Sequence, residues 1–187
     1  MHALGQRDFG ENYAQEALAK IDALAHLDIV WHFIGPIQSN KTRAIAERFS
    51  WVHSIDRFRI AERLAAQRPA GLPPLQACVQ VNVSGEASKS GCAPQEALAL
   101  ARAIAGLRGI SLRGLMAVPE PSEDSALQRA RFDSLRTLRD AIRADGTALD
   151  TLSIGMSHDL EQAIAAGATM VRIGTAIFGE RKIEVRT

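Results

Sequence analysis

Short apolar runs alternate with longer amphipathic stretches along the whole chain. Seven runs have the length and residue types of strands, at 7–10, 30–34, 51–54, 75–83, 111–118, 149–154 and 169–173. The stretches between them carry apolar residues at helical spacing and predict helices at about 13–25, 39–49, 57–67, 94–105, 123–144 and 159–166. Regular alternation of strand and helix is typical of a parallel sheet covered by helices, so we predict an α/β fold.

The number of predicted strands and the first residues together suggest a barrel. A closed (β/α)₈ TIM-type barrel has eight strands, one more than the pattern contains. Residues 1–5 resemble the last turn of a helix, with Gly5 as its stop. We therefore expect a single barrel domain over residues 1–187, with the first strand and most of the first helix missing in front. Without that strand we expect one of three outcomes, namely aggregation, pairing of exposed sheet edges between copies or marginal folding, and we expect the complete form to be a monomer.

Composition narrows the class of protein. The chain has 187 residues, 47% of them hydrophobic, and its 22 Lys and Arg against 21 Asp and Glu leave a formal charge of +1. Such a balance argues against nucleic acid or an anionic membrane as the main partner. No apolar run approaches the roughly 20 residues of a membrane span, and no signal peptide is recognisable, so we expect a cytoplasmic protein. Cys78 and Cys92 form no CxxC pair, and we expect no metal site.

Two segments near the C-terminal end place small polar residues directly after an apolar run. They are Gly155-Met156-Ser157-His158-Asp159 and Val171-Arg172-Ile173-Gly174-Thr175. In parallel α/β proteins the loop after a strand leads into a helix whose free N–H groups can bind a phosphate. Ser157, Gly174 and Thr175 are thus candidate phosphate ligands. The alternatives are that Ser157 caps the next helix and that Gly174 forms an ordinary turn.

Arg172 is an unusual residue for the end of a buried strand. Alternation directs Val171 and Ile173 to one face of the predicted strand and Arg172 to the other. A buried guanidinium needs an acceptor, because it does not lose its proton in proteins. The acceptor is either a ligand or a nearby carboxylate.

Six motifs in order resemble the pyridoxal phosphate homeostasis protein family. They are Phe9-Gly10-Glu11-Asn12-Tyr13, Trp31-His32-Phe33-Ile34-Gly35-Pro36-Ile37-Gln38-Ser39-Asn40-Lys41, Ser88-Lys89-Ser90-Gly91, Arg113-Gly114-Leu115-Met116, Leu152-Ser153-Ile154-Gly155-Met156-Ser157 and Val171-Arg172-Ile173-Gly174-Thr175-Ala176-Ile177-Phe178-Gly179. The resemblance covers nearly the whole chain. It implies a barrel of PLP fold type III, related to the N-terminal domain of alanine racemase, that binds pyridoxal 5′-phosphate (PLP) through a lysine.

The resemblance also implies roles for individual residues. Arg172 would pair with the ring nitrogen of PLP, and the phosphate would lie against Ser157, Gly174 and Thr175. Three further candidates for PLP binding lie at or near strand ends: Asn12, His32 and Met116. A helix cap is the alternative for Asn12, and packing within the protein interior is the alternative for His32 and Met116. We assign no catalytic residue.

The lysine of the family lies in a first strand upstream of the Phe-Gly-Glu-Asn-Tyr motif. The four lysines of this chain, Lys20, Lys41, Lys89 and Lys182, match positions outside that strand. Only Lys89, in a polar loop after a predicted strand, is considered as a substitute at the mouth of the barrel.

Three functions follow in order of preference. The first is PLP binding in intracellular PLP homeostasis, as a carrier without efficient catalysis. The second is a racemase-like PLP enzyme acting on a small amino acid, which needs a lysine to move the α-proton. The third is a barrel that binds another phosphorylated metabolite through the Ser157 and Thr175 loops.

Overall fold

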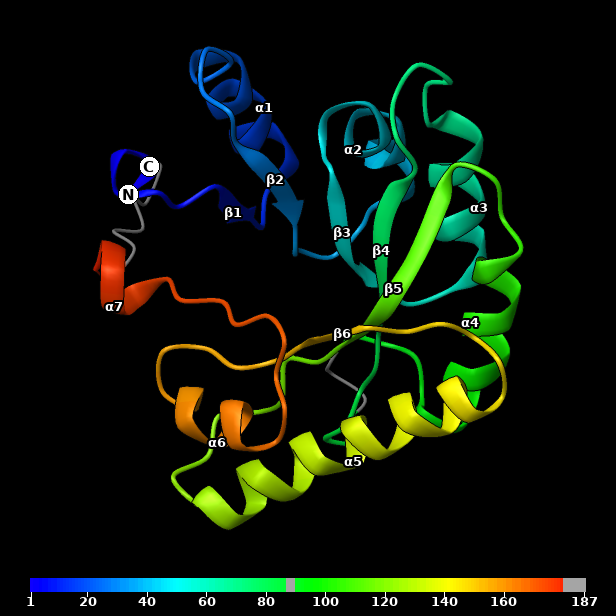
Figure 1. Ribbon diagram of the computed structural model, residues 1–187, viewed down its shortest axis with the longest axis vertical. Coiled ribbons are helices and arrows are strands. Elements are labelled where there is room, and N and C mark those ends of the chain that lie inside the picture. The colour runs from blue at the N-terminus through cyan, green and yellow to red at the C-terminus, as the bar shows by residue number, and fades with distance from the viewer. Residues whose placement is uncertain (87–89, 180–187) are drawn as a thin grey trace, which may run out of the picture.

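One parallel sheet organises the molecule. The computed structural model describes residues 1–86 and 90–179, and within these ranges the sheet has six strands in chain order. They are β1 (Asp8–Glu11), β2 (Val30–Phe33), β3 (Trp51–Ile55), β4 (Leu75–Gln80), β5 (Ile110–Met116) and β6 (Thr151–Ser153) (Figure 1). A sheet whose strand order never reverses is wound in one direction, as in a barrel and unlike a doubly wound fold. The predicted parallel α/β architecture is confirmed.

Helices connect successive strands and cover the outside of the sheet. The α-helices are α1 (Ala14–Ala23), α2 (Thr42–Arg48), α3 (Phe58–Gln67), α4 (Ala97–Ala105), α5 (Ser125–Ala144), α6 (Leu160–Ala165) and α7 (Thr175–Phe178), and the 3₁₀ turns are η1 (His2–Leu4), η2 (Ser39–Lys41) and η3 (Pro94–Glu96). Helices α3, α4 and α5 contact the strands directly, and α2 to α5 follow one side of the sheet (Figure 1). Within the described ranges, no helix is long and apolar enough to cross a membrane.

The face of the sheet toward the helices is apolar. Strand pairing aligns Val79 of β4 with Leu115 of β5 and Leu152 of β6, and all three are fully buried. Phe33 of β2 belongs to the same buried cluster and meets Phe49 edge to face, with ring centroids 5.4 Å apart. Burial of these side chains against the helices supplies the main stabilisation of the fold.

The opposite, inner face of the sheet carries polar side chains. In-register residues share a face, so Gln80, Met116 and Ser153 lie side by side across β4, β5 and β6. His53 Nδ1 on β3 lies 2.9 Å from Ser153 Oγ on β6. In a flat sheet these strands would be about 14 Å apart, three strand spacings. The hydrogen bond therefore requires the sheet to curl into part of a barrel around its inner face.

The predicted seventh strand, at 169–173, is wrong as a full strand. Within the described residues it makes one isolated parallel bridge, between Met170 and Ser153. Arg172 N still donates to Gly155 O at 2.9 Å. However, Gly155 has φ +94, which turns the neighbouring chain out of the extended conformation and ends the ladder.

Other predicted boundaries differ from the structure by a few residues. The predicted strand 75–83 ends at Gln80, because the chain then forms a separate bridge from Val81 to Cys92. The predicted terminal turn is confirmed, since η1 ends at Leu4 and Gly5 follows as its C-cap, with φ +95 and a hydrogen bond from Gly5 N to His2 O.

Candidate functional site

Arg172 follows β6 and places its guanidinium against the inner face. Its Nη1 donates to Ser153 O at 2.8 Å and Ser153 Oγ at 2.7 Å, and its Nη2 donates to Ala117 O at 2.9 Å. The predicted alternative of a carboxylate partner is not observed among its hydrogen bonds within the described residues. A guanidinium has five N–H donors, so two remain without a partner in the described part of the chain.

Burial lowers the pKa of this group without removing its charge at neutral pH. Desolvation lowers the pKa of Arg172 to about 10, opposed by the charges of Cys78 and Asp159. The guanidinium consequently stays protonated at neutral pH and offers N–H donors only. Such a group suits an acceptor without a proton of its own, such as a pyridine nitrogen.

Ser157 lies where the loop after β6 meets the start of α7. Its Oγ accepts a hydrogen bond from Ala176 N at 3.3 Å. The predicted alternative, that Ser157 caps the following helix, is wrong, because the N-cap of α6 is Asp159. Asp159 itself accepts from Met156 N at 2.6 Å and so closes the turn that carries Ser157.

Gly174 and Thr175 begin α7 beside Ser157. Gly174 is the N-cap, has φ −114, and has open space where a Cβ would lie. Neither backbone strain nor protein packing therefore requires glycine at this position. A ligand that approaches the backbone closely would give a reason for it. Thr175 is the first residue of α7 and is exposed.

Met116 is fully buried at the end of β5, in register with Ser153. It precedes Ala117, whose carbonyl accepts from Arg172. The structure therefore places Met116 next to the carbonyl that fixes Arg172, and the hydrogen bond from Ala176 N to Ser157 Oγ joins Ser157 to the start of α7 at Gly174 and Thr175.

Asn12 lies near the opposite edge of the sheet, in the loop after β1. It is exposed, and the predicted alternative that it caps a helix is wrong, because Tyr13 is the N-cap of α1. The backbone of Asn12 packs against Gly35, where a Cβ would come within 1.9 Å of Asn12 O. Glycine at 35 thus allows the loops after β1 and β2 to approach each other.

His32 is buried on β2 with both ring nitrogens bonded. Nε2 lies 2.9 Å from Asp8 Oδ1, and Nδ1 lies 2.9 Å from His53 Nε2. The ring also stacks on Trp51, with centroids 5.4 Å apart and planes at 8°. Burial lowers the pKa of His32, against the opposing effect of the Asp8 carboxylate. These contacts match a histidine satisfied within the protein interior.

Neither lysine in the described part of the chain lies in a strand. Lys20 is on α1 and pairs with Glu11, and Lys41 ends η2. Lys89 and Lys182 lie outside the described residues.

The sequence interpretation missed His53 and Ser153. Both are buried, and they link His32 to Arg172 through hydrogen bonds. The signal was present, because His53 follows Trp51 by two positions and so shares its face. However, the contact joins β3 to β6, which are not neighbours in the sheet.

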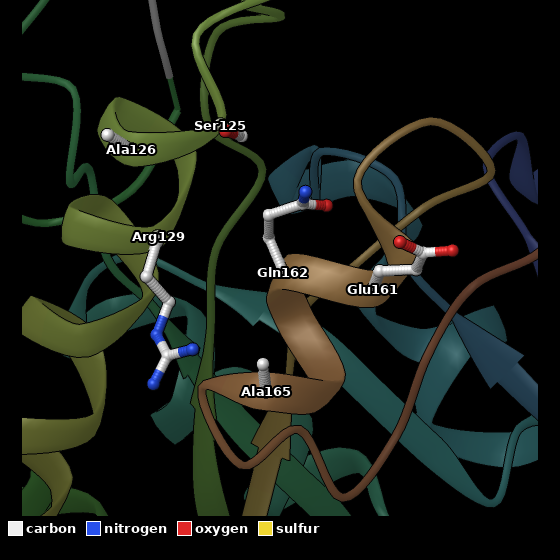
Figure 2. A pocket seen from close by; sticks show the side chains of 6 residues that line it. All are labelled: Ser125, Ala126, Arg129, Glu161, Gln162 and Ala165. Carbon is white, nitrogen blue, oxygen red and sulfur yellow. The ribbon is translucent and has the colours of Figure 1, made fainter.

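A separate hollow of about 320 Å³ lies in the outer layer of helices. Side chains of α5 and α6 line it, namely Ser125, Ala126, Arg129, Glu161, Gln162 and Ala165 (Figure 2). Arg129 already pairs with Asp133 at 2.8 Å. No residue of the inner face lines this hollow, so it does not belong to the site around Arg172.

Sequence comparisons assign the chain to a family. The sequence-family model of the alanine racemase N-terminal domain matches residues 1–182 of this chain. The pyridoxal phosphate homeostasis protein of Pseudomonas aeruginosa is 64% identical over 180 residues, which cover 96% of this chain and 77% of that protein. The protein of the same name from Escherichia coli K12 is 54% identical over 183 residues, covering 95% of this chain and 77% of its own length.

Solved structures agree in fold. PipY of Synechococcus elongatus without PLP is 38% identical with a TM-score of 0.89, and the match covers 95% of this chain and 84% of PipY. PipY with PLP bound gives 36% identity and a TM-score of 0.87 over the same shares. An alanine racemase from Clostridium difficile, at 11% identity and a TM-score of 0.78 over 98% of this chain and 47% of that one, shares the fold. The chain belongs to the pyridoxal phosphate homeostasis protein family, within the wider family of the alanine racemase N-terminal domain.

Proposed function

We propose that this chain binds PLP at the carboxyl ends of β5 and β6 and serves in PLP homeostasis. The observation that carries the proposal is Arg172, whose guanidinium is fixed by three hydrogen bonds and keeps two N–H donors without a partner in the described residues. The name of the relatives and the PLP-bound PipY structure support the choice of ligand.

Each site residue has a defined role in this proposal. Arg172 donates to the ring nitrogen, and Ser157, Gly174 and Thr175 bind the phosphate with a hydroxyl and backbone N–H groups. The open space at Gly174 supports this role, because it lets a phosphate reach the backbone. Met116 would line the pocket beneath the ring, whereas Asn12 would approach it from the β1 side. His32 has both ring nitrogens bonded within the protein and receives no ligand contact in this proposal.

The residues favour binding over catalysis. PLP supplies an aldehyde that reacts with amines and a ring that withdraws electrons. A guanidinium on the ring nitrogen keeps that nitrogen unprotonated and so makes the ring a poorer electron sink. The two lysines of the described residues lie outside the strands, which leaves no positioned base there for an α-proton.

The charge balance supports a small-molecule partner. A formal charge of +1 offers little attraction for nucleic acid or an anionic membrane. A cytoplasmic location, a single domain and a monomeric state are further parts of the proposal.

Calorimetric titration with PLP, pyridoxal and inorganic phosphate tests the proposal. We expect PLP to bind more tightly than either part alone, since ring and phosphate each make contacts. Arg172→Leu should weaken PLP binding by about tenfold, the loss of one charge-assisted hydrogen bond. The matched control is Arg43→Leu, which removes a guanidinium that pairs with Glu47 on the surface of α2. Equal affinity for PLP and simple phosphate esters would favour a general phosphate site instead.

The racemase-like alternative has its own test. Amino acids incubated with the chain and PLP in D₂O should exchange their α-hydrogen no faster than with PLP alone. Exchange above that rate would show catalysis.

A further inference from the structure

A continuous row of hydrogen bonds crosses the inner face from Arg172 to Asp8. Arg172 Nη1 lies 2.7 Å from Ser153 Oγ, which lies 2.9 Å from His53 Nδ1. His53 Nε2 lies 2.9 Å from His32 Nδ1, and His32 Nε2 lies 2.9 Å from Asp8 Oδ1. We call these five side chains the inner-face relay. Each comes from a different segment, on β1, β2, β3, β6 and the chain after β6.

The two ends of the relay fix where every proton lies. An ionised carboxylate only accepts, so Asp8 makes His32 Nε2 a donor and leaves the Nδ1 of a neutral His32 as an acceptor. His53 must then donate from Nε2 and accept at Nδ1. Ser153 is left to donate its hydroxyl proton to His53, which turns its lone pairs toward Arg172. Every bond in the relay therefore points from Arg172 to Asp8.

The surroundings keep both histidines neutral. His53 is fully buried, and desolvation lowers its pKa well below the usual value. Repulsion from a protonated His32 and from Arg172 acts in the same direction. The hydrogen-bonding groups at the two ends of the histidine pair are the carboxylate of Asp8 and the hydroxyl of Ser153, and the Trp51 ring lies against both histidine rings. A charged His53 could not accept from Ser153, so neutrality and the direction of the relay depend on each other.

We propose that His53 is a positioning residue for ligand binding: by accepting a hydrogen bond from the Ser153 hydroxyl it turns the lone pairs of that oxygen toward Arg172 and so fixes the guanidinium that faces the ring nitrogen. The inference rests on the proposed function, because it assigns Arg172 to the ring of PLP. It differs from it in naming residues that need not touch the ligand.

Nitrogen-15 NMR of the histidine rings tests the relay in the chain without ligand. We expect both His32 and His53 to be neutral, with the proton on Nε2 and none on Nδ1. A proton on Nδ1 of either ring, or an imidazolium at neutral pH, would overturn the inference regardless of whether PLP binds.

Variants of the relay test its effect on the ligand. His53→Leu and Ser153→Ala should each weaken PLP binding by about fivefold, the effect of about one neutral hydrogen bond. His53→Asn should recover most of the affinity, since its side-chain oxygen can replace Nδ1 as the acceptor. Affinity for inorganic phosphate should not change in any of them, because the relay acts on the ring side.

Thr151→Ala provides the matched control. Thr151 also lies on β6, two residues from Ser153, but its hydroxyl donates to Asp150 at 2.8 Å and is outside the relay. It should bind PLP as the unchanged chain does. If folded His53→Leu and Ser153→Ala bind PLP as tightly as the control does, the positioning role is overturned. Failure of the unchanged chain to bind PLP would instead refute the proposed function, and the ring NMR would still decide the relay.

Discussion

The two faces of the sheet obey different rules. On the outer face, buried apolar residues such as Val79, Leu115 and Leu152 pack against helices, and many substitutes of similar size would serve. On the inner face, Ser153 and His53 are equally buried but are held by hydrogen bonds with particular partners. The outer face therefore makes the fold stable, and the inner face makes the site specific.

The largest expected effect lies on the outer face. Phe33→Ala removes a ring that is almost fully buried and packs against Phe49, and should lower the free energy of unfolding by about 3–5 kcal/mol. Urea unfolding measures it. Phe178→Ala is the matched control, because that ring is 68% exposed, and it should cost less than about 0.5 kcal/mol. Similar losses at both positions would contradict the role given to the outer face.

A smaller loss of stability is expected on the inner face. His53→Leu keeps an apolar side chain in place but leaves Ser153 and His32 each without one partner. The unsatisfied groups should cost about 1–3 kcal/mol, measured by the same unfolding experiment. A variant more stable than the unchanged chain would show that the inner face tolerates apolar packing as the outer face does.

Acid should weaken the inner face before it affects the outer one. The pKa values of His32 and His53 are lowered by folding, so the unfolded chain takes up protons first. Stability is therefore complete above about pH 6.5 and falls as pH drops below that value, by at most about 1.4 kcal/mol per pH unit for each histidine. Urea midpoints between pH 7.5 and 5.5 measure the slope. His53→Gln should reduce it, and an unchanged slope would contradict the origin assigned to it.

The smallest effect is expected away from both faces. Arg43 pairs with Glu47 one turn later on the surface of α2, at 3.7 Å. Arg43→Ala should change the free energy of unfolding by less than about 0.5 kcal/mol, since exposed ion pairs contribute little. A larger change would mean that surface charges contribute to stability alongside the outer face.

Periodicity was sufficient for the outer face and for the order of elements. Alternation in the β2 region separates Trp31 and Phe33 from His32, and the structure places the first two in the hydrophobic cluster and His32 on the inner face. The segment at 169–173 was predicted as a full strand but forms a single bridge in the described residues. A strand needs a continuous hydrogen-bond ladder, and Gly155 interrupts the chain that pairs with this segment.

The inner face was harder to predict for a physical reason. Arg172, Ser157 and Gly174 were recognisable because each follows an apolar run directly in the sequence. His53 and Ser153 lie 100 residues apart, and they meet only because the sheet curls. Local sequence patterns carry no information about contacts between residues so far apart in the chain. His32 was therefore named without His53, the neighbour that connects it to Arg172.

The central claim is that Arg172 donates to the ring nitrogen of bound PLP. It is tested most directly by nitrogen-15 NMR of PLP labelled in the ring and bound to the chain. We predict the chemical shift of an unprotonated pyridine nitrogen that accepts a hydrogen bond, and a move toward the value of a pyridine nitrogen without a donor in Arg172→Leu. A shift typical of pyridinium in the unchanged chain would contradict it.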